Sequence, residues 1–218
     1  MGYLSVELAS QTRAHLNASV AVTDAELYRC LSRAQSDLLW RLPDDALRPL
    51  QAIVNGTLSS ARADLPADFA REQYVWYGAD QIDAHRVRAA DMPLLTTPLY
   101  LASETNPFYR IFYNTVETEP CLELLTGDDD DDAAYRFYYI KEPPAITEDE
   151  DPLLGQELWP PLIYFACSRV LEANGRYAES AKAQSLYMRL CTMFMARYSR
   201  TLEPYDERPG DPRWPTAT

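Results

Sequence analysis

The chain has 218 residues, of which 47% are hydrophobic, so it can bury one substantial core or two small ones. Its net charge of −13 argues against a protein that grips nucleic-acid phosphates, because such affinity comes from clustered Lys and Arg side chains. The charge is compatible with a surface past which DNA slides without sticking. No apolar run reaches the length of a membrane span, and the first residues lack the pattern of a secretory signal.

The first helix is predicted from its start signal. Residues 1–21 show no clear periodicity and are interpreted as an N-terminal arm or a loosely docked segment. Thr23 and Glu26 then form a capping box, and Pro43 predicts that the helix ends at about Arg41. Apolar residues follow at helical spacing, namely Leu27, Leu31, Ala34 and Leu38.

The middle of the chain has the character of a sheet. Residues 44–60 suit either a short helix or a strand leading to a turn at Asn55-Gly56. Beyond Tyr74, prolines at positions 93, 98, 107 and 120 exclude long helices. Residues that favour strands gather in four runs, at 74–77, 109–113, 121–125 and 135–140. We therefore predict a small antiparallel sheet or sandwich inserted between helices.

The last third is predicted to form a helical hairpin. Pro160 and Pro161 suit the first turn of a helix, and Asn174-Gly175 suits its left-handed stop. The first helix has one apolar face, formed by Ile163, Ala166, Cys167 and Val170. The second runs from about Tyr177 to Tyr198, with its apolar side assigned to Ala181, Met188, Cys191, Phe194, Met195 and Tyr198.

These elements predict an α+β fold, in which a helical bundle of one N-terminal helix and a C-terminal helical hairpin carries an inserted small antiparallel β-domain. The helical domain comprises residues 22–60 and 145–200, and the β-domain comprises residues 61–144. Residues 1–21 and 201–218 are arms. The C-terminal arm contains four prolines and cannot fold alone.

The sequence lacks the motifs of common enzymes. It has no glycine-rich phosphate loop and no nucleophile elbow. His15 and His85 lie in unrelated contexts, and the four cysteines form no C-x-x-C pair, so we expect reduced thiols that act as small hydrophobic residues. No catalytic, cofactor or metal residue is predicted, and the protein is not expected to be an enzyme.

The most conspicuous charged segment is a run of five aspartates, Asp128, Asp129, Asp130, Asp131 and Asp132. A calcium loop would space its ligands and use glycine to turn the chain. We interpret the run as a solvated hairpin tip between the strands at 121–125 and 135–140, with a charged lining or loose cation binding as the alternative. A second acidic run, at 147–151, precedes a helix, where negative charge suits the helix dipole.

The chain has 15 tyrosines, which suit interfaces because they combine apolar area with a hydroxyl group, although they also serve as ordinary sheet residues. The order of motifs then becomes informative. A capped helix containing Arg33-Ala34-Gln35 precedes Leu65-Pro66-Ala67-Asp68-Phe69, and Tyr138-Tyr139-Ile140-Lys141-Glu142-Pro143 precedes the final helices. This order resembles the head–tail adaptor proteins of tailed bacteriophages, including the tail tubular and head-completion proteins. The likeness covers roughly residues 22–200.

The resemblance implies a structural subunit of the phage neck, assembled in the host cytoplasm. Such a subunit forms a ring of typically twelve copies that joins the portal protein to the tail tube or nozzle and lines the DNA conduit, without specific DNA binding or a membrane. The candidate assembly contacts are Arg197, Tyr198, Tyr205 and Trp214. Two alternatives stay open: an acidic regulatory module for a basic partner, and another virion component such as a tail-completion or capsid-associated protein.

Overall fold

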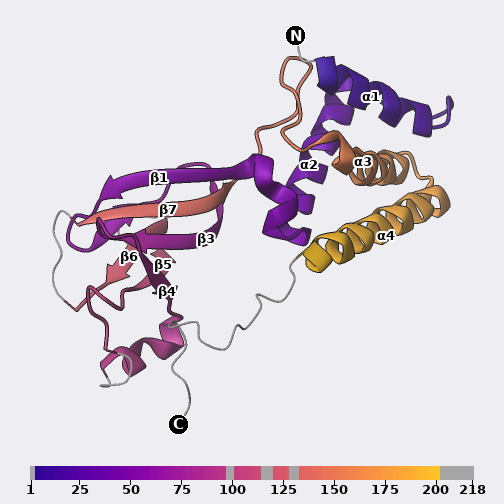
Figure 1. Cartoon of the computed structure of the whole chain (residues 1–218). Coiled ribbons are helices and arrows are strands. Elements are labelled where there is room, and N and C mark those ends of the chain that lie inside the picture. Colours follow the sequence, from indigo (N-terminus) through magenta and orange to yellow (C-terminus); the bar gives the residue numbers. More distant parts are fainter. Residues whose placement is uncertain (1–2, 97–100, 114–119, 128–132, 202–218) are drawn as a thin grey trace. The chain divides into compact units, whose positions relative to one another are not determined.

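A computed structural model of the chain describes residues 3–96, 101–113, 120–127 and 133–201. It confirms the α+β class (Figure 1). The helices are α1 (Tyr3–His15), α2 (Asp24–Arg41), α3 (Trp159–Ala173) and α4 (Tyr177–Thr201), and short 3-10 segments lie at Asp44–Leu50, Ala89–Thr96 and Gln156–Leu158. The strands are β1 (Gln51–Thr57), β2 (Arg62–Asp64), β3 (Phe69–Tyr77), β4 (Ile82–Arg86), β5 (Phe108–Tyr113), β6 (Pro120–Leu125) and β7 (Ala134–Lys141).

These elements form two compact units. The helical unit contains residues 1–49 and 143–218, and the sheet unit contains residues 50–142. Strand β1 is the first element of the sheet unit, whereas the sequence grouped all of residues 22–60 with the helices. That grouping was ambiguous because Leu50, Ile53 and Val54 fit an apolar helix face and a strand equally well.

Helix α2 follows its sequence signals closely. The Thr23 side chain accepts a hydrogen bond from the backbone N–H of Glu26, and the Glu26 carboxylate accepts one from the backbone N–H of Thr23. The helix ends at Arg41, as predicted. The whole predicted stripe is inaccessible to solvent, namely Leu27, Leu31, Ala34 and Leu38.

Helices α3 and α4 form the predicted antiparallel hairpin (Figure 1). Two prolines lie in the first turn of α3, where a missing N–H group costs no intrahelical bond. Gly175 lies in the short connection between α3 and α4 and has a φ of +71°. Glycine adopts this left-handed conformation without strain, so it ends α3. Cys167 is buried on α3, and burial raises the pKa of its thiol to about 12, which keeps it protonated.

Helix α1 corrects the prediction that residues 1–21 form an arm without regular structure. Its buried side consists of Ser5, Leu8, Ala9 and Thr12. Two of these four are polar, so the face that packs is not the most apolar face and the helix has no clear amphipathic pattern in sequence. The Thr12 hydroxyl donates to the carbonyl of Leu8, 2.8 Å away, which satisfies it inside the core.

The N-terminus of α1 is capped from a distant part of the chain. One carboxylate oxygen of Asp151 accepts hydrogen bonds from the backbone N–H groups of Leu4 and Ser5, at 2.8 and 2.9 Å. The acidic run at 147–151 thus supplies a negative charge to a helix N-terminus, as the sequence indicated. The helix that receives it is α1 and not the one that follows in sequence.

Asp151→Ala is therefore expected to destabilise α1 selectively. Loss of the cap should cost about 1 kcal/mol, the usual magnitude for such a group. Hydrogen exchange should accelerate at the N–H groups of residues 4–8 while α3 keeps its protection. Asp149→Ala, which removes an exposed carboxylate from the same run, is the matched control. Equal acceleration in both variants would contradict the capping role.

The sheet has seven strands in the order β1-β7-β3-β4-β5-β6-β2. All neighbours are antiparallel except β4 and β5, which are parallel, so the expectation of a purely antiparallel β-domain was wrong at this pair. Each of the four predicted runs lies in a strand, respectively β3, β5, β6 and β7. The core of the sheet unit contains residues from β3, β5, β6 and β7, including Val75, Phe137, Tyr109, Leu122 and Leu124.

The prediction of a turn at Asn55-Gly56 was wrong. Asn55 and Gly56 lie inside β1, paired with Arg136 and Tyr135 on β7. A Cβ atom on Gly56 would lie 2.8 Å from the Tyr135 ring. Glycine is therefore needed here because it leaves space for this ring, and not because the chain turns. The reversal comes later, at Ser60 and Ala61, both of which have positive φ.

The aspartate run does not connect neighbouring strands. Strand β6 pairs with β5 and β2, and β7 pairs with β1 and β3, so the expected hairpin between 121–125 and 135–140 does not exist. The pattern could not reveal this, because pairing across the sheet depends on the positions of all seven strands. Asp128–Asp132 lie outside the described residues.

Tyrosine burial makes the sheet unit sensitive to alkali. Burial raises the pKa of Tyr109 to about 12, and burial together with a hydrogen bond to Asp68 raises the pKa of Tyr139 to about 12. An unfolded tyrosine ionises near pH 10, so between about pH 10 and pH 12 the folded state holds more protons than the unfolded state. The stability that Tyr109 and Tyr139 contribute is therefore fully present below about pH 10 and is lost as the pH rises to about 12.

We expect the free energy of unfolding in urea to fall steeply between about pH 10 and pH 12. In the Tyr109→Phe variant the free energy of unfolding should fall less steeply with pH than in the unchanged protein, because phenylalanine has no proton to lose on unfolding. Tyr177→Phe, at a tyrosine that is 70% exposed, should leave the slope unchanged. Identical slopes for all three proteins would show that buried tyrosines do not drive the alkaline transition.

Candidate interaction surfaces

The described residues do not bring together a set of metal ligands. Within residues 3–96, 101–113, 120–127 and 133–201, no group of three His, Cys, Asp or Glu side chains converges as metal ligands would. The two histidines pack against aromatic rings: His15 lies 5.3 Å from Tyr164, and His85 lies 5.7 Å from Phe108, between ring centroids. None of the helices in the described part of the chain combines the length and apolar character that a membrane span requires.

An open pocket of about 380 Å³ lies in the helical unit, between α2 and residues 145–148. The surface that it exposes is mostly apolar, although five of the eight residues that line it carry polar side chains, namely Tyr28, Arg29, Ser32, Thr147 and Glu148. The Ser32 hydroxyl accepts a hydrogen bond from the backbone N–H of Ile146 at 2.9 Å.

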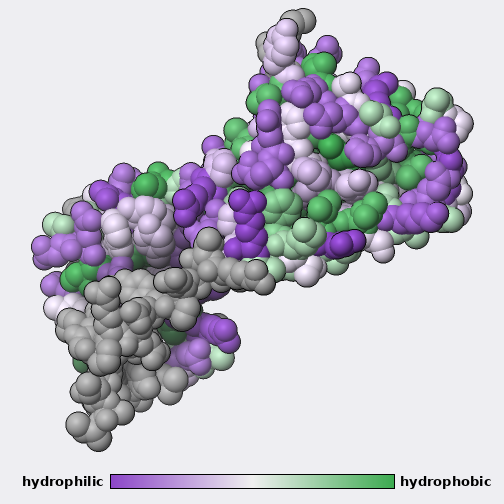
Figure 2. All heavy atoms as spheres, turned by 45° about the vertical axis from the view of Figure 1, so that its right-hand side comes forward, coloured by the Kyte–Doolittle hydropathy of each residue, from purple (hydrophilic) through white to green (hydrophobic). Residues whose placement is uncertain are grey.

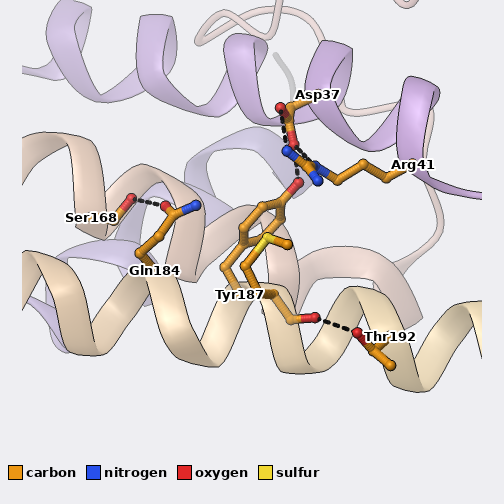
Figure 3. A network of polar contacts seen from close by, with 7 residues as sticks. Asp37, Arg41, Ser168, Gln184, Tyr187 and Thr192 are labelled. Carbon is orange, nitrogen blue, oxygen red and sulfur yellow. Dashed lines mark hydrogen bonds and ion pairs between the residues drawn. The ribbon is translucent and has the colours of Figure 1, made fainter.

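The packed side of α4 is organised around Tyr187. Its side chain is completely buried, and its ring meets the Phe165 ring of α3 edge-on, with centroids 5.2 Å apart. Its hydroxyl donates a hydrogen bond to the Asp37 carboxylate on α2, which also binds Arg41 (Figure 3). Burial and this bond raise the pKa of Tyr187, so it remains a neutral donor. A single side chain thus links three helices.

This arrangement corrects the apolar side assigned to α4 from the sequence. Cys191 is buried as expected, but the other buried residues are Ala183 and Tyr187. Met188 and Met195, which the sequence placed against the core, are 41% and 39% exposed. The physical reason is that a buried tyrosine with a bonded hydroxyl competes with methionine for the interior, and hydropathy does not show this.

Helix α4 consequently presents apolar residues to solvent on both sides of its packed face. Leu186 and Met193 are 41% and 57% exposed on one side, and Met188 and Met195 lie on the other. Members of each pair are seven residues apart, so they align along the helix axis. Hydrophobic residues interrupt the hydrophilic surface of the helical unit in Figure 2. Contiguous exposed apolar surface is a common feature of protein–protein contacts.

The sheet unit contains a charged cluster on one face. The register of β2, β6 and β5 places Arg62, Glu123 and Arg110 in one row. Glu123 is only 7% exposed and accepts hydrogen bonds from both arginines. The two guanidinium groups also lie 5.4 and 4.9 Å from the ring centroid of Phe112. Because the carboxylate is paired on both sides, this cluster fixes the short strand β2 in place.

Only part of the predicted assembly contacts can be located. Arg197 is exposed and Tyr198 is half-buried in the last turns of α4, with the guanidinium 6.0 Å from the tyrosine ring. Tyr205 and Trp214 lie outside the described residues. Sequence patterns did not single out the exposed stripes of α4, although the seven-residue spacing of their members was available as a signal.

Comparison with known proteins gives a family match. No curated protein matches the chain significantly. The sequence model of the SU10 adaptor protein family matches residues 5–213, which include the whole sheet unit, most of the helical unit and most of α1. The match extends further at both ends than the resemblance found by inspection. The chain therefore belongs to the SU10 adaptor protein family, a family of phage head–tail adaptors.

Proposed function

We propose that this protein is a ring-forming subunit of the phage neck, which joins the portal to the tail tube or nozzle and lines the DNA conduit. The observation that carries the proposal is the family match over residues 5–213. The family is structural and generally non-enzymatic. The protein acts by assembly, and no bond is made or broken.

The exposed stripes of α4 support contacts between copies. A closed ring needs a heterologous interface, in which each subunit uses two different surfaces to bind its two neighbours. Helix α4 offers an apolar stripe on either side of its packed face, with Leu186 and Met193 on one and Met188 and Met195 on the other. Each stripe would be buried against the adjacent copy, while the helical hairpin keeps its own core.

The charge supports a place beside passing DNA. A net charge of −13 weakens attraction to phosphates, so a wall made from many copies would let DNA slide. Arg197 and Tyr198 at the end of α4, with Tyr205 and Trp214 beyond it, are the proposed contacts with the portal or the neighbouring subunit.

Cryo-electron microscopy of the neck in purified particles tests this proposal. We expect density for a ring of the chain, typically of twelve copies, directly beneath the portal. Density for the chain elsewhere on the shell or tail, or particles that lack it, would overturn the proposal and favour another virion component or a non-virion binding protein.

The stripe on one side of α4 can be tested by charge substitution. Leu186→Glu combined with Met193→Glu should reduce incorporation into particles about tenfold or more, because charges would enter an apolar contact. Ser185→Glu combined with Thr192→Glu is the matched control, since both residues are exposed, lie on the same helix and have the same spacing. Equal incorporation of the two doubly substituted chains would exclude this stripe from the ring contact.

A further inference from the structure

One exposed row along α4 alternates basic and apolar side chains. Its members follow one another three or four residues apart and therefore share one face of the helix, namely Lys182, Leu186, Arg189 and Met193. All four are exposed to solvent. Lys182 and Arg189 have no ion-pair partner among the described residues. We call these four residues the basic row.

The charge of this row contrasts with the rest of the chain. Beyond Glu179, α4 carries no acidic side chain up to its end at Thr201, whereas the whole chain has a net charge of −13. The stripe with Met188 and Met195 lacks this feature, because Gln184 and Thr192, which flank it at helical spacing, are neutral. The two stripes of α4 thus suit different partners, and the basic row suits a surface that is both apolar and acidic.

The helical unit contains such a surface at the open pocket between α2 and residues 145–148. The exposed surface of the pocket is mostly apolar, and Glu148 lies among its lining residues. Asp149 and Glu150 follow and are exposed, and the three carboxylates have no ion-pair partner in the described part of the chain. Asp151 differs from them because it caps α1. We call the pocket, together with these three carboxylates, the acidic pocket.

The basic row and the acidic pocket lie on different sides of the helical unit. The Ser5 hydroxyl on α1 donates to the backbone carbonyl of Glu148 at 3.1 Å, so the acidic pocket lies next to α1. Helix α3 lies between α1 and α4 (Figure 1). One copy therefore cannot bring its own row to its own pocket, but two neighbouring copies can, as a heterologous interface requires.

We propose that the basic row of each copy docks into the acidic pocket of the next copy. Leu186 and Met193 enter the pocket, and Lys182 and Arg189 pair with the carboxylates at 148–150. Arg29 also lines the pocket, but the three carboxylates outnumber it. This inference rests on the proposed ring and deepens it, because it names the surface that receives one of the two stripes of α4.

Crosslinking in purified particles tests the docking. Met193→Cys combined with Ala145→Cys places one thiol in the row and one beside the pocket, and both positions are exposed. The four native cysteines are buried, so a short bis-maleimide should react mainly at the new thiols. We expect a ladder of covalent multiples of the chain on a denaturing gel. Each single variant, and Met195→Cys combined with Ala145→Cys as the matched control, should give no ladder.

Charge reversal tests the ion pairs independently. Lys182→Glu combined with Arg189→Glu should lower incorporation into particles about tenfold, because four or more carboxylates would then face one another. Adding Glu148→Lys and Glu150→Lys to the same chain reverses both partners, so incorporation should return to within about threefold of the unchanged protein. All four side chains are exposed, so the helical unit should keep its fold.

A control variant separates the row from the net charge. Arg48→Glu combined with Arg88→Glu makes the same change in net charge at two exposed arginines outside the row and the pocket, and should leave incorporation unchanged. A loss as large as that of the row variant would contradict the proposal.

The outcomes distinguish this inference from the proposed function. A ring beneath the portal in the unchanged particles, without the ladder from Met193 and Ala145, would overturn the docking and leave the adaptor function intact. Failure of the reversed chain to regain incorporation would exclude the ion pairs between the row and the pocket. Particles without any ring of the chain would overturn the docking and the proposed function together.

Discussion

Tyr187→Ala is expected to lower the free energy of unfolding of the helical unit by about 3–5 kcal/mol, the range for removing a large buried aromatic ring. The side chain is fully buried, contacts Phe165 on α3 and bonds to Asp37 on α2. Its loss would leave a cavity where three helices meet and would remove the donor to Asp37. Urea unfolding followed by circular dichroism at 222 nm is the measurement.

Two further variants separate the contributions of the ring and the hydroxyl. Tyr187→Phe keeps the packing and loses only the hydrogen bond to Asp37, so it should cost about 1–2 kcal/mol. Tyr177→Ala, on the same helix but 70% exposed, should change stability by less than about 0.5 kcal/mol. If Tyr187→Ala were as mild as Tyr177→Ala, Tyr187 would not be the residue that links the three helices.

Phe137→Ala is expected to destabilise the sheet unit by a similar amount, about 3–5 kcal/mol. Phe137 is inaccessible to solvent on β7, and its ring lies 5.6 Å from the Tyr139 ring and 5.7 Å from the Phe69 ring. Strand β7 pairs with both β1 and β3, so a cavity there weakens the centre of that half of the sheet. Ile53→Ala, at an exposed position on β1, is the control.

The two large substitutions together test whether the units unfold separately. The chain enters the sheet unit at Leu50 and leaves it at Glu142, so each unit has its own core. We therefore expect Phe137→Ala to increase hydrogen exchange in β1, β3 and β7 while α3 keeps its protection, and Tyr187→Ala to do the reverse. A single transition that both substitutions shift equally would show that the chain unfolds as one cooperative body.

Short-range signals in the sequence were reliable guides to local structure. The capping box at Thr23 and the glycine stop at Gly175 each satisfy backbone groups within a few residues, so the pattern alone determines them. Such elements need no knowledge of the rest of the molecule. The run at 135–140 also predicted a strand correctly, namely β7, although β1 and β3, which satisfy its backbone groups, are distant in sequence.

The identity of exposed surfaces was harder to predict. Met188 and Met195 are apolar and were assigned to the core, but they belong to the exposed part of α4. Helix α4 has more apolar residues than its packed face can bury. Shape and hydrogen bonding then decide which residues are buried, and here Tyr187 occupies the interior. The family relationship fits the excess apolar surface, since an adaptor associates with other phage components.

The sequence by itself determined the α+β class, helix α2, the α3–α4 hairpin and the strand runs, because periodicity, caps and proline positions act locally. The tertiary structure alone decided three other features: helix α1, whose N-terminus Asp151 caps across the chain, the separation of β6 from β7, and the side of α4 that is buried. Each of these depends on contacts between residues far apart in sequence. No local pattern encodes such contacts, because their free energy exists only once the distant partners have met.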